Sequence, residues 1–535
     1  LMPENQMNLP GVGGQMGQST GLTMGQQVPQ PGPPLQKPDQ GYVTPRPADP
    51  EKEQSRDLDA MLNKVNIAKG MGDEELEKIA SEVIRGFDAD LQSKADWDKS
   101  VDEWIKLAAQ VKELRSWPWP KASNVKYPLL ATAAMQFAAR AYPNLVPADG
   151  KVVQLRVVGL DPKGEKAKLA DKLSKHMNYQ LLEQMDDWEE EMDRLLIQLP
   201  IVGCLFKKTY FCPIRKRNVS KLVGPKDLVV NYWASTLEEA YRKTEVISMN
   251  ANQIREKQLY GIYSDIELSK PSYPDVQALN VHGNKPPSQV DESTPYCVLE
   301  QHTFLDLDKD GYEEPYIITV ERYNRKVLRI VARWDSDGIE LDAEKDVISI
   351  KPVEYYTKYG FIPNPDGSFY DIGFGHLLGS LNESANTIIN QLIDAGTLSN
   401  LQSGFIGKGL RLKMGESRLE PGEWRTVNAS VEDIGKQIFP LPLKEPSTVL
   451  FQLLGLVVQS GKELASVAEI FTGKMPGQNT PATTTMATIE QGMKVFTAIY
   501  KRTYRAYTRE FKKLFRLNGL YQENIDSAKI ILDEP

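Results

Sequence analysis

The spacing of apolar positions changes several times along the chain and predicts helical regions separated by strand-rich ones. Apolar residues recur every three or four positions over 73–89 and 94–111, which is typical of amphipathic helices. The same spacing over 164–198 predicts one long helix, with the stripe Leu169, Leu173, Met177, Leu181, Met185, Trp188, Met192 and Leu195. Its C-terminal half would carry the acidic run 186–191 against the helix dipole, so other contacts would have to stabilise it.

Shorter patterns fill the first two thirds of the chain. A run of small residues over 127–141, followed by Pro143, predicts a helix, and 151–158 resembles a strand. The stretch 201–246 is rich in β-formers, with a turn expected near 215–218, and residues 265–295 have the composition of a loop. Three strands follow, and they predict a small β-rich module of roughly fifty residues; they are 296–307, 315–323 and 326–333.

Three long helices are predicted in the last third. The first covers 373–400, the second runs from an N-cap at Ser447 to a C-cap at Gly473, and the third follows Thr480-Pro481 and ends near Asn518-Gly519. A strand-like block over 404–427 separates the first two. The pattern as a whole predicts an α+β fold that is mainly helical.

Composition narrows the class of protein. The chain has 535 residues, 41% of them hydrophobic and 25% charged, as expected for globular domains, and its net charge is −8. A protein that grips DNA over its whole surface would need a basic footprint, so that class is excluded. Three cysteines without regular spacing argue against a disulfide framework or a zinc site. No signal peptide is visible, and the longest apolar stretch, 449–458, is about half a membrane span.

The first fifty residues differ from the rest, since they hold 10 Pro, 8 Gly and 8 Gln. We expect residues 1–55 to form a disordered or extended N-terminal arm, which is either a plain tail or a segment that wraps a neighbour.

Familiar catalytic motifs do not occur, so we expect no enzyme activity, no catalytic residues and no cofactor. The nearest match to a phosphate-binding loop is 455–462, but it has one residue too many between its glycines and Glu463 where Ser or Thr is needed. We interpret this stretch as an ordinary helix. None of the four histidines belongs to an HExxH motif, and there is no GxSxG.

One segment resembles half of a calcium loop. Asp306, Asp308 and Asp310 have the right spacing, but Ile317 stands where a bidentate Glu is required. A tight β-turn explains the same residues, and both interpretations stay open.

The distribution of basic residues is uneven. Residues 359–407 contain no Lys or Arg, although the average composition predicts about six in such a stretch. The helix expected at 373–400 would present Glu383, Asn386, Asn390 and Asp394 on its non-apolar side. Without cations such a face cannot hold phosphates, so it could line a tunnel along which DNA slides. The alternative is a helix whose polar face packs against a neighbouring subunit.

The third long helix has the opposite character. It carries seven basic residues: Lys501, Arg502, Arg505, Arg509, Lys512, Lys513 and Arg516. This face could contact DNA, but a solvated basic face is the more common explanation.

Three sequence segments resemble portal proteins of tailed bacteriophages, and those of short-tailed phages in particular. They are WPWPKASNVKYPLL (117–130), FIPNPDGSFYDIGFG (361–375) with its continuation NQLIDAGT (390–397), and PATTT (481–485) with EQG (490–492). The resemblance covers about residues 90–520. It implies a portal-type architecture with wing, stem, clip and crown, and a ring of twelve subunits at one capsid vertex.

The resemblance also implies a domain plan. After the arm (1–55) it expects a wing (56–250), a stem approach and loop (251–294), a β-rich clip (295–355) and a stem helix (356–400). Next come a wing segment with the tunnel-loop region (401–475), a crown helix (476–520) and a C-terminal tail (521–535). The candidate tunnel-loop residues are Leu441, Pro442, Leu443, Lys444 and Glu445.

The implied function is a channel for double-stranded DNA during genome packaging and ejection. Its expected partners are further copies of the chain, the terminase large subunit, the tail adaptor, and the major capsid and scaffolding proteins, with no membrane. Its expected place is the virion's portal vertex, after assembly in the host cytoplasm. The alternatives are another head–tail structural protein, such as an adaptor, and a calcium-stabilised hydrolase.

Overall fold

The computed structural model describes residues 61–112, 122–147, 149–269, 271, 294–307, 309, 311–341, 347–400, 404–406, 438–440, 446–464 and 482–521. All of them belong to one compact unit, residues 56–535. Within these residues the fold is α+β and mainly helical, as predicted. Its helices, including short 3-10 turns and a π segment (both marked η), are η1 (Ile67–Gly70), α2 (Asp73–Ser93), α3 (Ala95–Ala108), α4 (Leu129–Leu145), α5 (Glu165–Tyr179), η2 (Gln180–Gln184), α6 (Trp188–Val202), α7 (Ala251–Leu259), η3 (Ser336–Gly338), α9 (Phe374–Asn400), α11 (Thr448–Leu464) and α12 (Ala482–Tyr521).

Twelve strands form four antiparallel sheets within the described residues. The strands are β1 (Cys204–Cys212), β2 (Arg217–Val223), β3 (Leu228–Val230), β4 (Lys243–Met249), β5 (Tyr296–Leu305), β6 (Glu314–Glu321), β7 (Lys326–Ala332), β8 (Ile339–Leu341), β9 (Val347–Ile350), β10 (Tyr356–Gly360), β11 (Gly404–Ile406) and β12 (Ile438–Pro440). Their orders are β10-β1-β2, β3-β4-β5-β6-β7, β8-β9 and β11-β12. The predicted strands over 296–333 are confirmed, but they do not form a separate module. β4 pairs with β5 from Lys243↔His302 to Met249↔Tyr296, and this joins them to residues 228–249.

The prediction of one long helix over 164–198 is wrong in one respect, because the helix is interrupted in the structure. α5 continues into the π segment η2, the chain leaves helical geometry at Met185, and α6 begins at Trp188. Glu189, Glu190 and Glu191 therefore lie in the first turn of a new helix, where the dipole stabilises negative charge. The break resolves the conflict that an uninterrupted helix would have created.

The prediction of a strand at 151–158 is also wrong, since these residues pair with no strand in the part of the chain that the structure describes. Their backbone is satisfied by side chains of α5 instead. Asn178 accepts a hydrogen bond from Val153 N at 2.7 Å and donates one to Val153 O at 3.1 Å, while Ser174 Oγ accepts from Leu155 N at 2.9 Å. The segment is extended, but a helix rather than a strand supplies its partners.

Two other expectations about helices differ from the structure or extend beyond it. Pro143 does not end α4 but lies inside its last turn, and the helix continues to Leu145. The second long helix begins at Thr448, one residue after the expected N-cap Ser447. Its expected C-cap, Gly473, lies outside the described residues.

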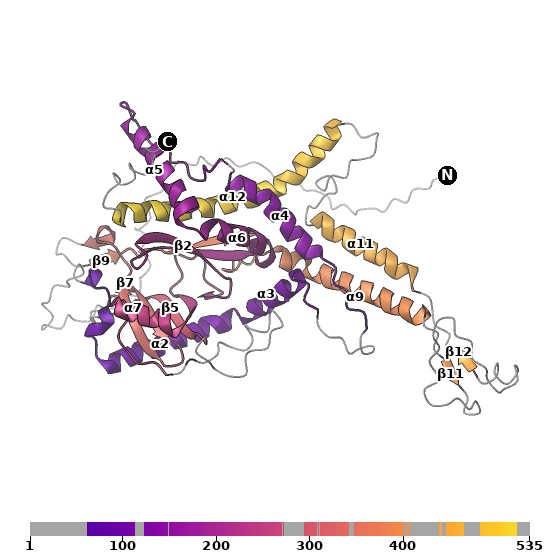
Figure 1. Cartoon of the computed structure of the whole chain (residues 1–535), viewed down its shortest axis with the longest axis horizontal. Coiled ribbons are helices and arrows are strands. Elements are labelled where there is room, and N and C mark those ends of the chain that lie inside the picture. Colours follow the sequence, from indigo (N-terminus) through magenta and orange to yellow (C-terminus); the bar gives the residue numbers. More distant parts are fainter. Residues whose placement is uncertain are drawn as a thin grey trace, which may run out of the picture. The chain divides into compact units, whose positions relative to one another are not determined.

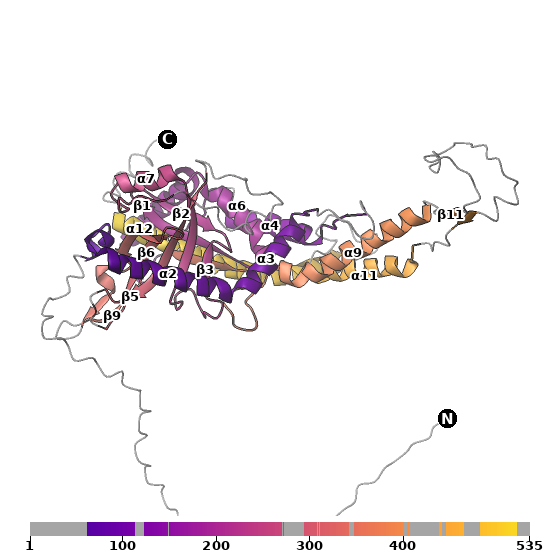
Figure 2. The ribbon, with the colours of Figure 1, turned by 90° about the horizontal axis from the view of Figure 1, so that it is seen from below.

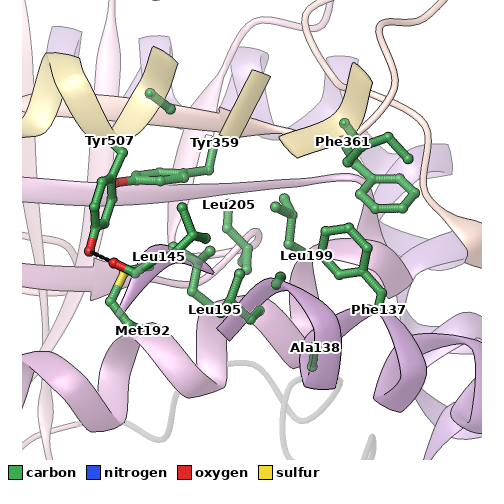
Figure 3. Packing of buried hydrophobic residues seen from close by; sticks show 14 of the residues in the cluster. Phe137, Ala138, Leu145, Met192, Leu195, Leu199, Leu205, Tyr359, Phe361 and Tyr507 are labelled. Carbon is green, nitrogen blue, oxygen red and sulfur yellow. Dashed lines mark hydrogen bonds between the residues drawn. The ribbon is translucent and has the colours of Figure 1, made fainter. Parts of the chain in front are cut away.

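The main core lies where helices cover the three-stranded sheet. α4, α6 and α12 meet there with β1 and β10, and their side chains pack around Phe137, Leu195, Leu199, Leu205 and Tyr359 (Figure 3). Tyr507 of α12 closes this core by donating a hydrogen bond to Leu145 O at 3.0 Å. A second core lies between α2 and the five-stranded sheet, around Val83, Ile318 and Trp334.

Candidate functional site

The helices α9 and α11 lie side by side and form an antiparallel hairpin (Figures 1 and 2). Gly396, near the end of α9, faces Pro446, just before α11. At the opposite end, Gly461 of α11 packs against Leu129, the first residue of α4. The β11–β12 pair lies where α9 ends and α11 begins (Figure 1). We call α9, α11 and this strand pair the hairpin.

The start of α9 is clamped by glycines of the 361–375 motif. A Cβ on Gly375 would lie 2.5 Å from Ile201 O and 2.5 Å from Trp104 Cγ, and one on Gly373 would lie 2.6 Å from Gly203 N. Real Cβ atoms do not approach other atoms so closely, so only glycine fits. These residues therefore serve the close packing of α9 on the end of α6 and on α3.

The polar stripe of α9 binds the chain's own backbone. Asn386 Oδ1 accepts from Tyr127 N at 2.6 Å, Asn390 Oδ1 from Val125 N at 2.7 Å, and Asp394 Oδ1 from Ser123 N at 2.8 Å. Asn382 Oδ1 accepts from Leu130 N at 3.1 Å, in the first turn of α4. We call these contacts the amide ladder.

The amide ladder forms because the residue spacing of an extended chain nearly matches that of a helix. Alternate residues of an extended chain are about 6.6 Å apart, and every fourth residue of a helix is about 6 Å further along its axis. Every second N–H of the 123–127 segment therefore meets one side chain of α9. Two of the segments that carry the portal resemblance are thus in direct contact, although they are far apart in the sequence.

The ladder gives three of the four candidate tunnel-lining residues another role. Asn386, Asn390 and Asp394 are only 7%, 4% and 8% exposed, and their side-chain oxygens are engaged with the backbone of residues 123–127. They do not offer a free polar face. The expectation of a packed polar face described them better, except that the partner is the same chain and not a neighbouring subunit. Glu383 alone of the four is exposed.

The exposed face of α9 is shifted by one residue from the expected one. From residue 376 to 391 it consists of His376, Ser380, Glu383, Ser384, Thr387 and Gln391, and nearer the end of α9 Ile393, Thr397, Leu398 and Asn400 are exposed as well. The first six residues form the outer stripe, which holds hydroxyl and amide groups, the imidazole of His376, one carboxylate and no Lys or Arg. The sequence contained a signal for it: short Asn and Asp side chains at strict four-residue intervals are suited to bonding backbone, which leaves Ser, Thr and Gln for solvent.

The second helix of the hairpin exposes apolar side chains. Val449, Phe451 and Leu456 of α11 are 68%, 70% and 64% exposed. Between α11 and the end of α9 lies an open groove of about 670 Å³, lined mainly by apolar side chains including Ile389, Leu392 and Leu454. Large exposed apolar patches are uncommon on monomeric proteins and are found at protein or membrane interaction sites and in ligand-binding grooves.

Outside the hairpin, α12 is anchored by a buried carboxylate. Glu510 is fully buried and accepts hydrogen bonds from Ser220 Oγ at 2.6 Å, Trp188 Nε1 at 3.1 Å and the hydroxyl of Tyr359, while Lys207 Nζ lies at 3.4 Å. Burial by itself would raise the pKa of Glu510. The Lys207 ammonium and the three hydrogen-bond donors outweigh that effect and hold the pKa below its ordinary value.

A second buried cluster joins the two larger sheets. Lys208 of β1 lies 2.6 Å from Glu245 and 2.7 Å from Glu300, and Tyr356 of β10 donates to Glu245 at 2.9 Å. Burial lowers the pKa of the neighbouring His302 to about 3, so the imidazole is neutral. The Lys208 ammonium lies between the two carboxylates, and these contacts hold β1 and β10 against β4 and β5.

The basic residues of α12 divide into two groups. Lys513 donates to Tyr356 O and Thr357 Oγ1, Arg502 donates to Phe361 O at 3.0 Å, and Arg516 pairs with Asp335. Lys501, Arg505, Arg509 and Lys512 are exposed. The first group fixes α12 to the fold, while the second leaves cations at the surface.

The remaining candidates are only partly covered by the structure. Asp306 Oδ2 accepts from Gly311 N at 3.0 Å in the turn between β5 and β6, whereas Asp308 and Asp310 lie outside the described residues. The tunnel-loop candidates 441–445 lie outside them as well. Residues 455–462, the imperfect phosphate loop, are helical and belong to α11, which confirms their interpretation as an ordinary helix.

The described residues contain neither a group of metal ligands nor a membrane-spanning helix. In that part of the chain no three His, Cys, Asp or Glu side chains gather as metal ligands would. No described helix combines the length and apolar character needed to cross a membrane.

Comparison with known proteins adds no family. No protein-family model matches this sequence, and no curated protein matches it.

Proposed function

We propose that the chain is the portal protein of a tailed bacteriophage, a ring subunit through which double-stranded DNA passes. The observation that carries the proposal is the hairpin. Its helix α9 presents a polar outer stripe without cations, and its helix α11 exposes an apolar face beside it. A ring built from such hairpins can cover the apolar faces between subunits and direct the outer stripes toward a duplex.

The absence of Lys and Arg from the outer stripe matters for sliding. A cation that neutralises a phosphate releases counterions, and this creates binding that DNA must break at every step. Ser380, Thr387 and Gln391 can only make weak, exchangeable hydrogen bonds through water. Glu383 adds repulsion. A lining of this composition lets DNA move without capturing it.

In this proposal the hairpin is the stem. A module that docks other proteins at the end of the stem has to be connected to both helices, so the β11–β12 region between α9 and α11 is the more natural clip. The strands over 295–355, which share a sheet with β3 and β4, then belong to the wing. α12 remains the proposed crown helix.

The proposed partners follow from these roles: the terminase large subunit and later the tail adaptor at the clip, and the major capsid and scaffolding proteins around the wing. The proposed place is the portal vertex of the virion. An ATPase is not required of this chain, because the terminase supplies the motor.

The first test is the assembly state of the purified full-length chain, by negative-stain electron microscopy and light scattering. We expect rings with a central hole wide enough for duplex DNA. V449D/L456D, which charges the exposed face of α11, should reduce rings to monomers, because a buried unpaired carboxylate is costly. The matched control V158D/L160D changes two side chains that are 94% and 91% exposed and should leave rings intact.

Compact monomers at all concentrations would contradict the proposal and favour the hydrolase alternative. Rings that resist V449D/L456D would show that the hairpin is not the assembly element.

The second test concerns the channel. T387K/Q391K adds two cations to the outer stripe, and T387N/Q391N keeps it neutral. With the matching terminase and procapsids, the lysine variant should package DNA more slowly, and more so at low salt, while the asparagine variant behaves as wild type. Equal packaging rates for both variants would remove the outer stripe from the DNA path.

A further inference from the structure

The exposed cations of α12 lie on one face of the helix. At about 100° per residue, Lys501, Arg505, Arg509 and Lys512 fall within an arc of about 80° and extend over about 16 Å along the axis. The opposite face is the one that carries Glu510 into the protein. The only carboxylate among the described side chains of α12 is thus turned away from its cations. We call these four residues the basic stripe.

Among the described residues, the basic stripe has no counter-charges. Within the described part of the chain, no hydrogen bond or ion pair involves any of its four side chains, whereas Arg516, one turn further on, is paired with Asp335. Four unpaired cations on one face repel each other, and that cost falls when an anion binds. The stripe persists in a chain whose net charge is −8.

We propose that the basic stripe binds the phosphate backbone of double-stranded DNA. This is a contact separate from the hairpin, and it does not depend on ring formation. Over about 16 Å a duplex presents about nine phosphates, so each of the four cations finds one without a special register. Two of the four are arginines, whose guanidinium groups bind phosphate oxygens in pairs.

A protein partner fits the stripe less well. A second copy of the chain could offer the exposed acidic residues within 186–190, but Arg217 and Arg194 already pair with Asp186 and Glu190. Its α2 offers another acidic face with Glu74, Glu77 and Glu82. Lys78 and Arg85 interrupt that face, so a second copy would bring cations against the stripe. DNA has no such interruptions. The observations therefore favour a duplex over a further copy of the chain.

The test measures binding of a labelled 30-base-pair duplex of random sequence to the full-length protein by fluorescence anisotropy, from 50 to 200 mM NaCl. Four phosphate contacts predict a slope of log K against log salt of about −3.6, which is about a 150-fold loss of affinity over that range. K501Q/R505Q/R509Q/K512Q should flatten the slope and weaken binding at 50 mM NaCl by at least about tenfold.

The matched control is K163Q/K166Q/K168Q/K172Q. It removes the same number of charges from four exposed lysines in and just before α5: Lys163 lies in the preceding turn, and Lys166 lies on a different side of α5 from Lys168 and Lys172. We expect its affinity and salt slope to stay within about twofold of wild type, because dispersed charges contribute only a weak general attraction. Melting temperatures of both variants should equal that of wild type, since all eight side chains are exposed.

Three results would overturn the proposal. Wild type could fail to bind the duplex at 50 mM NaCl. The two quadruple variants could lose affinity equally, which would make the attraction non-specific. Finally, the α12 variant could keep DNA binding but lose self-association, which would assign the stripe to a second copy of the chain.

Discussion

The helices α9 and α12 both turn polar side chains toward the interior, but they expose opposite kinds of surface. α9 turns three short polar side chains inward onto the backbone of residues 123–127 and leaves a cation-free surface outside. α12 turns its carboxylate Glu510 inward onto Lys207 and leaves four cations outside. The comparison teaches that the charge a helix shows to solvent depends on which of its polar groups are buried as well as on its composition, because α9 buries Asp394 and α12 buries Glu510.

The largest expected effect comes from the inward side of α12. Glu510→Gln removes the charge that Lys207 needs in the interior, and an unpaired buried ammonium costs about 3–5 kcal/mol of unfolding free energy. The measurement is urea unfolding followed by fluorescence. Its control on the outward side of the same helix is Lys512→Gln, which should change stability by less than about 0.5 kcal/mol.

A double variant sharpens this result. E510Q/K207M removes both charges, so it should recover part of the loss seen in E510Q alone. If E510Q were as stable as wild type, the anchor assigned to Glu510 would be wrong.

The next effect comes from the inward side of α9. Asn390→Ala removes the acceptor for Val125 N and for the Ser123 hydroxyl, and the donor to Val125 O. Leaving such groups without partners should cost about 2–3 kcal/mol. Gln391→Ala, one position along and exposed, should cost less than about 0.5 kcal/mol. Equal losses at the two positions would refute the amide ladder.

A smaller effect is expected where α9 begins. Gly375→Ala places a methyl group 2.5 Å from Ile201 O, and a carbonyl of the main chain cannot move aside cheaply. We expect a loss of about 2 kcal/mol in thermal unfolding. At Gly379 the nearest atom is Trp104 Cδ1 at 3.4 Å, so Gly379→Ala should be close to neutral because alanine also favours the helix. A neutral result at Gly375 would show that α9 is not clamped there.

The smallest effect concerns the buried lysine of α12, Lys513. Burial lowers the pKa of Lys513 to about 8, although Glu354 and Glu238 oppose the shift. Between pH 8 and its ordinary value near 10.5, the unfolded chain binds more protons at this site than the folded one, so stability should rise with pH in that window. Below pH 8 this contribution is lost.

Comparing wild type with Lys513→Met isolates the contribution of the Lys513 amine to the free energy of unfolding. The difference in unfolding free energy between wild type and this variant should change by about 1–2 kcal/mol between about pH 8 and pH 9.5. A flat difference for Lys513 would mean that its amine is protonated throughout.

The sequence was sufficient to predict most helices and strands, but not which of their faces are buried. Hydrophobic spacing located α9 and α12, because both have a continuous apolar stripe. It could not reveal that Asn386 and Asn390 are buried, since their partners are backbone N–H groups about 260 residues away. In α12 the pattern gave seven basic residues, and only contacts with β10, residue 361 and Asp335 separate the anchored ones from the free ones.

The misjudged segments share one cause. The spacing of apolar residues continues through 185–187, so it gave no sign of the break between α5 and α6. The acidic run at 186–191 did indicate a break, because negative charge in the C-terminal half of one long helix is unfavourable for the helix dipole. Residues 151–158 alternate like a strand, but Ser174 and Asn178 satisfy their backbone. In both places a polar group decided the conformation where apolar spacing alone did not.

The amide ladder also constrains the order of events during synthesis. Residues 123–130 leave the ribosome long before 382–394, so their amides must stay hydrated until more than 250 further residues have been made. Closing so long a loop is entropically costly and slow. The join between these two segments should therefore be among the last parts of the fold to gain protection from hydrogen exchange.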